Sequence, residues 1–312
     1  MSNLSPRGVA AIGSGQLART FCAAPALVMG GPDFDLDLSK APGVSPQIPS
    51  PGGSAGPLSG GRNGDAPQLA GRMPAPRSLS RDYRGFKFEP LPGAEAEARS
   101  VAKLLGGDCV LRVGSEAREA ELKAVVSPRV LHLATHGFFL SDQEFKRTNG
   151  LTGDSLPFDA LARQRNPGED WENPMVRCFI ALAGANHAGQ ITNAAAEDGL
   201  LTGLEASLLN LQGTELVILS ACDSGSGEVK IGEGVMSLQR ASRIAGARTV
   251  LASHWRVSDK ATGRLMTDFM RRWRSGEPRA QAWREAQLSL LHSEEFANPY
   301  FWAAFTLTGQ WK

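Results

Sequence analysis

The chain has 312 residues, of which 42% are hydrophobic and 21% are charged, so it can bury one large α/β core or two modest ones. Its 33 basic and 32 acidic side chains leave a formal net charge of +1, which gives no strong field toward nucleic acid or an acidic membrane. No apolar run approaches the roughly 18 residues of a membrane-spanning helix, and the N-terminus lacks the basic and apolar regions of a signal peptide. We therefore expect no direct nucleic-acid partner and no membrane contact.

The four cysteines, at positions 22, 109, 178 and 222, include no Cys-x-x-Cys pair and no close pair. This spacing argues against a disulfide framework or a structural zinc site and fits a reducing, cytoplasmic compartment. The alternating carboxylates of residues 33–37 lack the glycine of a calcium loop, because Leu38 stands in its place. The glycines at 225 and 227 lack the third glycine of a dinucleotide turn, where Lys230 stands. We therefore expect neither a metal nor a cofactor.

Apolar residues along the chain alternate between strand spacing and helix spacing. A leader over residues 1–25 precedes a domain over 26–312, and the Pro-, Gly- and Ser-rich stretch at about 40–84 is expected to be a disordered insert. Helices are expected at 92–105, 116–125, 203–211, 235–244, 261–273 and 280–292, and strands at 26–30, 109–113, 130–136, 177–183, 214–222, 248–255 and 301–307. This alternation predicts an α/β fold with a mostly parallel central sheet covered on both faces.

Two short apolar runs each end in a residue of nucleophilic chemistry. The run from Val130 ends at His136, and the run from Leu216 ends at Cys222; both then pass into small and glycine residues. Each run has the length and composition of a strand buried on both faces. If the strands are parallel neighbours, both residues leave the sheet at its carboxyl edge, where open α/β sheets place their sites. The pattern indicates a Cys/His nucleophilic pair.

A free cysteine is only slightly ionised at neutral pH, so Cys222 needs a partner to act as a nucleophile, and His136 has the matching strand-end position. The glycine-rich turn after Cys222 leaves its backbone N–H outside a strand ladder. Together with the N–H of Gly137, it would form an oxyanion hole. The alternative is a buried, inert cysteine, the commonest state of a lone cysteine.

Four motifs together resemble the CHAT domain, a bacterial caspase-like family related to separase and caspases. They are His132-Leu-Ala-Thr-His-Gly137, Leu219-Ser-Ala-Cys-Asp-Ser-Gly225, Gly232-Glu-Gly234 and Asn298-Pro-Tyr-Phe-Trp-Ala-Ala304. The agreement covers residues 26–34 and 86–312, in the family's order. The resemblance implies a three-layer α/β/α caspase-like sandwich. It also implies a cysteine endopeptidase acting on a protein substrate, with His136 as general base or orienting group and Cys222 as nucleophile.

The chain departs from the family pattern in two places. Family members often carry tetratricopeptide repeats, whereas only about 25 residues precede the first expected strand, and the stretch at 40–84 is longer than the family core needs. The irregular connection over 138–174 is long enough to gate the site, so we expect control by an activating protein partner. The alternatives are a catalytically silent caspase-fold scaffold or interaction module, and a hydrolase of small esters.

Two acidic residues are candidates for binding substrate. Asp259 follows the strand that ends at Trp255, in a stretch similar to one that carries an acidic residue in separases; the alternative is a role in capping the next helix. Glu197 and Asp198 form a second candidate pair, for which a loop-capping role is equally open. His132 shares its strand with His136, and we interpret it as a packed, hydrogen-bonded core histidine because its spacing builds no zinc site on a strand.

Overall fold

A computed structural model describes residues 24–39, 86–140, 173–190, 197–221, 233–255 and 258–311. The expected insert at 40–84 and the expected nucleophile Cys222 lie outside these residues. The long connection over 138–174 is described only at its two ends.

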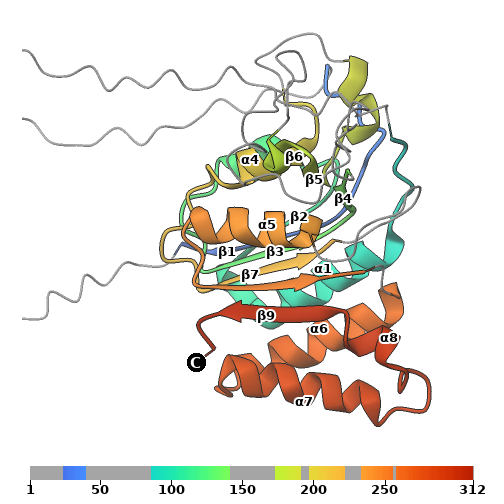
Figure 1. The fold of residues 1–312 in the computed structure, drawn as a ribbon, viewed down its shortest axis with the longest axis vertical. Helices are drawn as coiled ribbons and strands as arrows, with labels where there is room; N and C mark the ends of the chain where they lie inside the picture. Colours follow the sequence, from blue (N-terminus) through green and yellow to red (C-terminus); the bar gives the residue numbers. More distant parts are fainter. Residues whose placement is uncertain are drawn as a thin grey trace, which may run out of the picture.

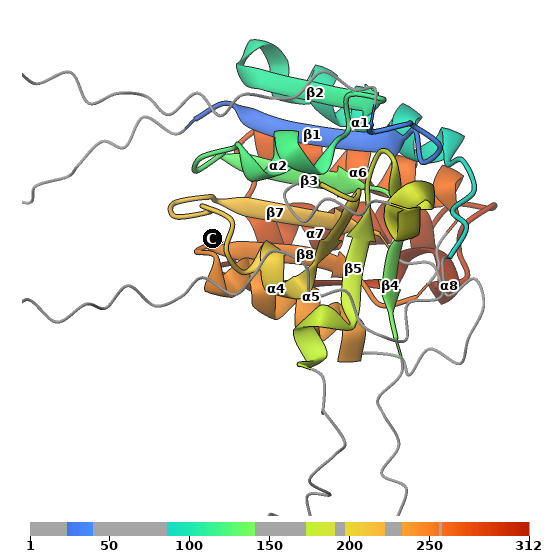
Figure 2. The same cartoon turned by 90° about the horizontal axis from the view of Figure 1, so that it is seen from above.

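Six strands form the central sheet, in the order β2-β1-β3-β7-β8-β9 (Figures 1 and 2). Their bounds are β1 Ala26–Pro32, β2 Cys109–Gly114, β3 Val130–Ala134, β7 Leu216–Ser220, β8 Thr249–Ser253 and β9 Phe305–Gly309. All neighbouring pairs are parallel except β8 and β9, which are antiparallel. The predicted mostly parallel sheet is confirmed, with one antiparallel strand at its edge.

Helices and a smaller sheet cover the two faces of the central sheet. The helices are α1 Pro92–Leu105, α2 Glu119–Lys123, α4 Gly203–Ala206, α5 Glu233–Ile244, α6 Asp259–Arg274, α7 Arg279–Leu291 and α8 Pro299–Trp302. In Figure 1, α1, α6 and α7 lie below the sheet, while α5, α4 and the smaller sheet lie above it. The strand side chains alternate accordingly: Val28 and Ile218 face the first set, and Leu27 and Val217 face the second. The fold is thus the predicted α/β/α sandwich.

The smaller sheet is antiparallel and consists of β4 Gly137–Phe139, β5 Cys178–Ala181 and β6 Leu200–Thr202. Short 3-10 helices lie at Gly106–Asp108, Pro174–Val176 and Ala185–Gln190. The chain turns from β3 into β4 within two residues, and this turn is fixed by bonds to β5. The Thr135 hydroxyl donates to the carbonyl of Ala181 at 2.6 Å, and the Ala181 N–H donates to the carbonyl of His136 at 2.9 Å. His136 therefore lies at the junction of the two sheets.

Several expected elements differ from the structure. The expected strand at 301–307 was wrong in its first half: Pro299 at the first helical position and the side chain of Asn298, which accepts from the N–H of Tyr300, start α8 instead. The helices expected at 116–125 and 203–211 are shorter, ending at Lys123 and Ala206. None of the helices in the described ranges is long and apolar enough to cross a membrane.

Candidate functional site

His136 follows β3 at the carboxyl edge of the central sheet and is 5% exposed. Its Nε2 lies 2.9 Å from the backbone carbonyl oxygen of Glu89. A carbonyl oxygen can only accept, so Nε2 carries the hydrogen and, in the neutral imidazole, Nδ1 carries the lone pair. Pro90 restricts Glu89 to extended conformations, which helps to hold this carbonyl in place. The imidazole is thus held in the tautomer in which Nδ1 can accept a proton.

Three phenylalanine rings surround the imidazole. The ring centroids of Phe34, Phe88 and Phe138 lie 5.3, 5.9 and 6.1 Å from that of His136. Phe34 and Phe88 are themselves buried and belong to one apolar cluster beside the smaller sheet. The rings exclude water from the imidazole and limit its rotation.

Strand register relates His136 to the end of β7. Ala134 is the partner of Ser220, and the Thr135 N–H continues the pairing by donating to the carbonyl of Ser220 at 3.2 Å. Beyond it, Gly137 lies against Ala221 so closely that a Cβ atom on Gly137 would collide with the Ala221 carbonyl oxygen. Cys222 is joined to Ala221 by the next peptide bond but lies outside the described residues, so its pairing with His136 stays a prediction.

The N–H of Gly137 points away from β5. The bond from the Ala181 N–H to the His136 carbonyl makes these two residues a hydrogen-bonded pair, and Gly137 is the next residue, opposite Ile180. Alternation along an antiparallel ladder then directs the Gly137 N–H outward from this pair of strands. This orientation is compatible with the expected oxyanion-hole role, which stays a prediction.

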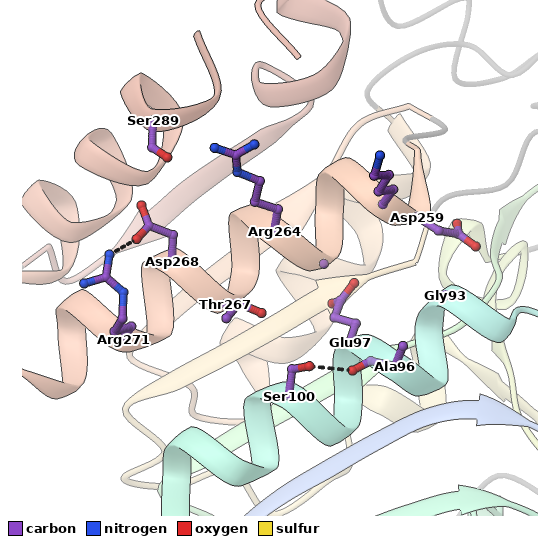
Figure 3. A pocket seen from close by; sticks show the side chains of 12 residues that line it. Gly93, Ala96, Glu97, Ser100, Asp259, Arg264, Thr267, Asp268, Arg271 and Ser289 are labelled. Atoms are coloured by element: carbon purple, nitrogen blue, oxygen red, sulfur yellow. Dashed lines mark hydrogen bonds and ion pairs between the residues drawn. The ribbon is translucent and has the colours of Figure 1, made fainter. Parts of the chain in front are cut away.

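Asp259 begins α6 and lies against the first turn of α1, where Gly93 leaves room for its side chain (Figure 3). Both helices begin at the carboxyl edge of the sheet (Figure 1), and a groove of about 740 Å³ runs between them (Figure 3). Ser258 precedes the helix as its N-cap residue but makes no side-chain capping bond. Asp259 therefore lies at the edge that carries His136, at one end of this groove.

Asp198 lies on the other face of the central sheet, just before β6, and is 7% exposed. Its Oδ1 accepts from the N–H of Leu200 at 2.9 Å. This contact is the loop-capping role that the sequence analysis gave as the alternative to substrate binding. It belongs to an acidic cluster with Glu119, Glu197 and Glu205 around Lys123. The two candidate acids, Asp259 and Asp198, are thus not brought together.

Burial raises the pKa of Glu119 well above its ordinary value; the positive charge of Lys123 opposes this, while Glu197, Glu205 and Asp198 add to it. For Lys123, burial alone would lower the pKa, but its charge attraction to Glu119 and its hydrogen bonds to Glu119 and Glu197 outweigh burial and raise the pKa. The raised pKa of Glu119 therefore follows first from its burial and then from the neighbouring carboxylates, and Lys123 is the cation that offsets their negative charge.

A family model for the CHAT domain matches residues 5–310. The chain belongs to the CHAT domain family. The same chain is similar to Tetratricopeptide repeat protein 28 from Homo sapiens and from Mus musculus, with 29% identity over 223 residues in each case. These matches cover 70% of this chain but only 8% and 9% of the relatives, so the chain spans a small part of the length of the curated relatives it matches.

His132 of this CHAT domain is fully buried, and its Nε2 lies 2.9 Å from Oε1 of Glu97 on α1. The prediction of a packed, hydrogen-bonded core histidine is confirmed. The other carboxylate oxygen of Glu97 accepts from the hydroxyl of Ser220 at 3.3 Å, so one buried carboxylate joins α1 to the two strands that lead to His136 and Cys222. Within the described ranges, no group of three or more acidic, histidine or cysteine side chains could hold a metal ion.

Sequence reasoning missed Glu89 and the three rings around His136, which belong to Phe34, Phe88 and Phe138. Glu89 acts through its carbonyl, which every residue type carries, so its side chain gives no signal. Phe34 and Phe88 lie within the stretches 26–34 and 86–312 over which the sequence resembles the family. Their spatial meeting around His136 depends on contacts between distant parts of the chain.

Proposed function

We propose that this CHAT domain is a cysteine endopeptidase that cleaves a protein substrate, with Cys222 as nucleophile and His136 as general base. The observation that carries the proposal is the hydrogen bond from His136 Nε2 to the Glu89 carbonyl, which gives the neutral ring its proton-accepting lone pair at Nδ1. The register of β3 and β7 supports it, because Gly137 packs on Ala221, the residue before Cys222.

In the proposed reaction, Nδ1 of His136 takes the proton of the Cys222 thiol, and the thiolate attacks the carbonyl carbon of the scissile peptide bond. The N–H groups of Gly137 and Cys222 stabilise the negative oxygen of the tetrahedral intermediate. The intermediate collapses when the C–N bond breaks, and the imidazolium gives its proton to the leaving amine. Water, deprotonated by His136, then attacks the thioester, releases the carboxylic acid and restores the thiol.

For substrate binding, we propose Asp259 ahead of Asp198. Asp259 is exposed and lies at the carboxyl edge, and its carboxylate would bind a basic side chain of the substrate through a charge-assisted hydrogen bond. Asp198 is nearly buried and already accepts from the N–H of Leu200, so a substrate would have to displace existing contacts. Asp198 is the second candidate for binding the substrate.

We also propose that an activating protein partner controls access to the site. The relatives named for tetratricopeptide repeats suggest association with other proteins, and the long connection between β4 and β5 follows His136 closely in sequence. Such a connection is suited to gating, because it directly follows β4, the strand that holds Phe138 beside the imidazole.

The test is cleavage of a fluorogenic peptide library by wild type, Cys222→Ala and His136→Ala, with and without lysate from the source cell. Each substitution should reduce kcat by at least about a thousandfold, since each removes a group that acts as one unit with the other. Cys109→Ser is the matched control and should cleave like wild type. Peptide cleavage that survives Cys222→Ala would refute the assignment, and a wild type without any thiol activation would instead favour the silent scaffold.

A further inference from the structure

Residues 86–89 carry two of the contacts that fix His136, although they form no strand or helix. The Glu89 carbonyl accepts from Nε2 of the imidazole, and the ring of Phe88 packs beside it. An irregular segment holds such geometry only where its backbone groups are bonded to something rigid. The question is therefore which group holds Phe88 and Glu89 in place.

The side chain of Asn186 supplies that support. Its Oδ1 accepts from the Phe88 N–H at 2.7 Å, and its Nδ2 donates to the Phe88 carbonyl at 3.1 Å. Nδ2 also donates to Oδ1 of Asp35 at 2.8 Å. The partners fix the orientation of the amide, because the Phe88 N–H can only donate while a carbonyl and a carboxylate can only accept. Asn186 thus bonds both backbone groups of Phe88, as a neighbouring strand would.

The backbone of Asn186 is bonded to the segment that carries Phe34, the second ring beside the imidazole. Its N–H donates to the carbonyl of Phe34 at 3.0 Å, and nearby the Gly184 N–H donates to the carbonyl of Asp33 at 3.0 Å. Phe34 and Phe88 are the two rings that reach His136 from outside its own strand and β4. One residue, half-buried in the 3-10 helix after β5, therefore ties together the two segments that hold the imidazole.

We propose that Asn186 is a positioning residue for His136: its amide holds residues 86–89 so that the Glu89 carbonyl and the Phe88 ring set the tautomer and orientation of the imidazole. This inference rests on the proposed function, since it assigns Asn186 to the same reaction. In this role Asn186 acts through Phe88 and Glu89.

The decisive substitution is Asn186→Asp, which keeps the size of the side chain and the oxygen that faces the Phe88 N–H. It replaces the donor Nδ2 with an oxygen that faces two acceptors, the Phe88 carbonyl and the Asp35 carboxylate. Asn186→Ala removes the same bonds without adding charge. The matched control is Asn210→Asp at the opposite edge of the sheet, where the side-chain oxygen accepts from the Ser127 hydroxyl and an aspartate accepts equally well.

Three readouts are measured: kcat and KM on the cleaved peptide, the pH dependence of iodoacetamide alkylation of Cys222, and the melting temperature. Both Asn186 variants should lose about tenfold to a hundredfold in kcat with KM within about twofold. Their alkylation profile should move toward that of an ordinary thiol, while Asn210→Asp behaves like wild type. A purely structural role would lower the melting temperature and leave kcat and the alkylation profile of the folded protein unchanged, and that result overturns the inference.

Two outcomes distinguish a failure of this inference from a failure of the proposed function. If the wild-type thiol is activated and folded Asn186→Asp retains the wild-type profile, the inference fails and the peptidase proposal stands. If the wild-type thiol is itself not activated, both fail. Hydrogen exchange of the wild-type protein is a further test that needs no variant. The Phe88 amide should be protected from exchange although it belongs to no strand, and rapid exchange of this amide would contradict the inference.

Discussion

A methyl group at Gly137 should disable the site while leaving the rest of the fold intact. Gly137 begins β4 directly after His136, and a Cβ atom there would lie well inside 3.0 Å of the Ala221 carbonyl oxygen and 3.1 Å from the Ala221 carbonyl carbon. Ordinary carbon–oxygen contact would require the two segments to separate by about 1 Å. His136 is held in place by the bond from Ala181 and by the Glu89 carbonyl, so the displacement falls on residue 221 and on Cys222 after it.

A misplacement of about 1 Å between nucleophile and base costs on the order of a hundredfold in rate, so Gly137→Ala should lower kcat by about that factor. Overpacking should also lower the free energy of unfolding by about 1–3 kcal/mol, as measured by urea denaturation. Gly107→Ala is the control, because a Cβ atom there meets nothing within 4 Å. A folded Gly137→Ala variant with the kcat of wild type would refute the reasoning that this contact sets the position of Cys222.

Three further substitutions test other parts of the account. Glu97→Ala leaves the fully buried His132 without its partner and should lower the free energy of unfolding by about 3 kcal/mol in urea denaturation. The control is Glu95→Ala in the same helix, where the side chain is partly exposed, and it should change the free energy of unfolding by less than about 0.5 kcal/mol. Equal effects would contradict the buried role of Glu97. Because burial raises the pKa of Glu119, the native state keeps this proton to higher pH than the unfolded chain, and wild-type stability should fall as pH rises through that range. Glu119→Gln cannot ionise, so its stability relative to wild type should increase as the pH rises above the ordinary pKa of a glutamate, and a constant difference would contradict the raised pKa. Pro90→Ala frees the residue whose carbonyl binds His136 and should reduce kcat about threefold at unchanged KM in peptide assays; an unchanged kcat would show that the proline does not set this carbonyl.

Local pattern was sufficient to predict most of the central sheet and its long helices. The helix over 92–105 appears with the expected bounds, because Pro92 and the glycines at 106–107 mark its ends and apolar residues repeat along one face. Of the smaller sheet, only β5 was predicted, within the strand expected at 177–183; β4 and β6 have three residues each, too short to show a period. Their pairing depends on contacts between segments far apart in sequence, which no local pattern encodes.

The site was predictable only in part, for a related reason. His136 stands out because a strand run ends in a titratable side chain, and the structure places it at the expected edge. The carbonyl that orients it belongs to Glu89, 47 residues earlier, and the amide that holds that segment belongs to Asn186, 98 residues from Phe88. Such contacts follow from the folded arrangement and not from the spacing of residue types.

The most direct test of the central claim is site-resolved labelling of the wild-type protein with a peptide-based cysteine electrophile, read by mass spectrometry as a function of pH. The account predicts that Cys222 is labelled at pH values where an ordinary thiol is protonated and that His136→Ala abolishes this advantage. Cys109, whose thiol pKa burial raises, and Cys178, which is fully buried, serve as internal controls and should stay unlabelled under the same conditions. Labelling of Cys222 only where a free cysteine reacts, alike in wild type and His136→Ala and unchanged by source-cell lysate, would contradict the account.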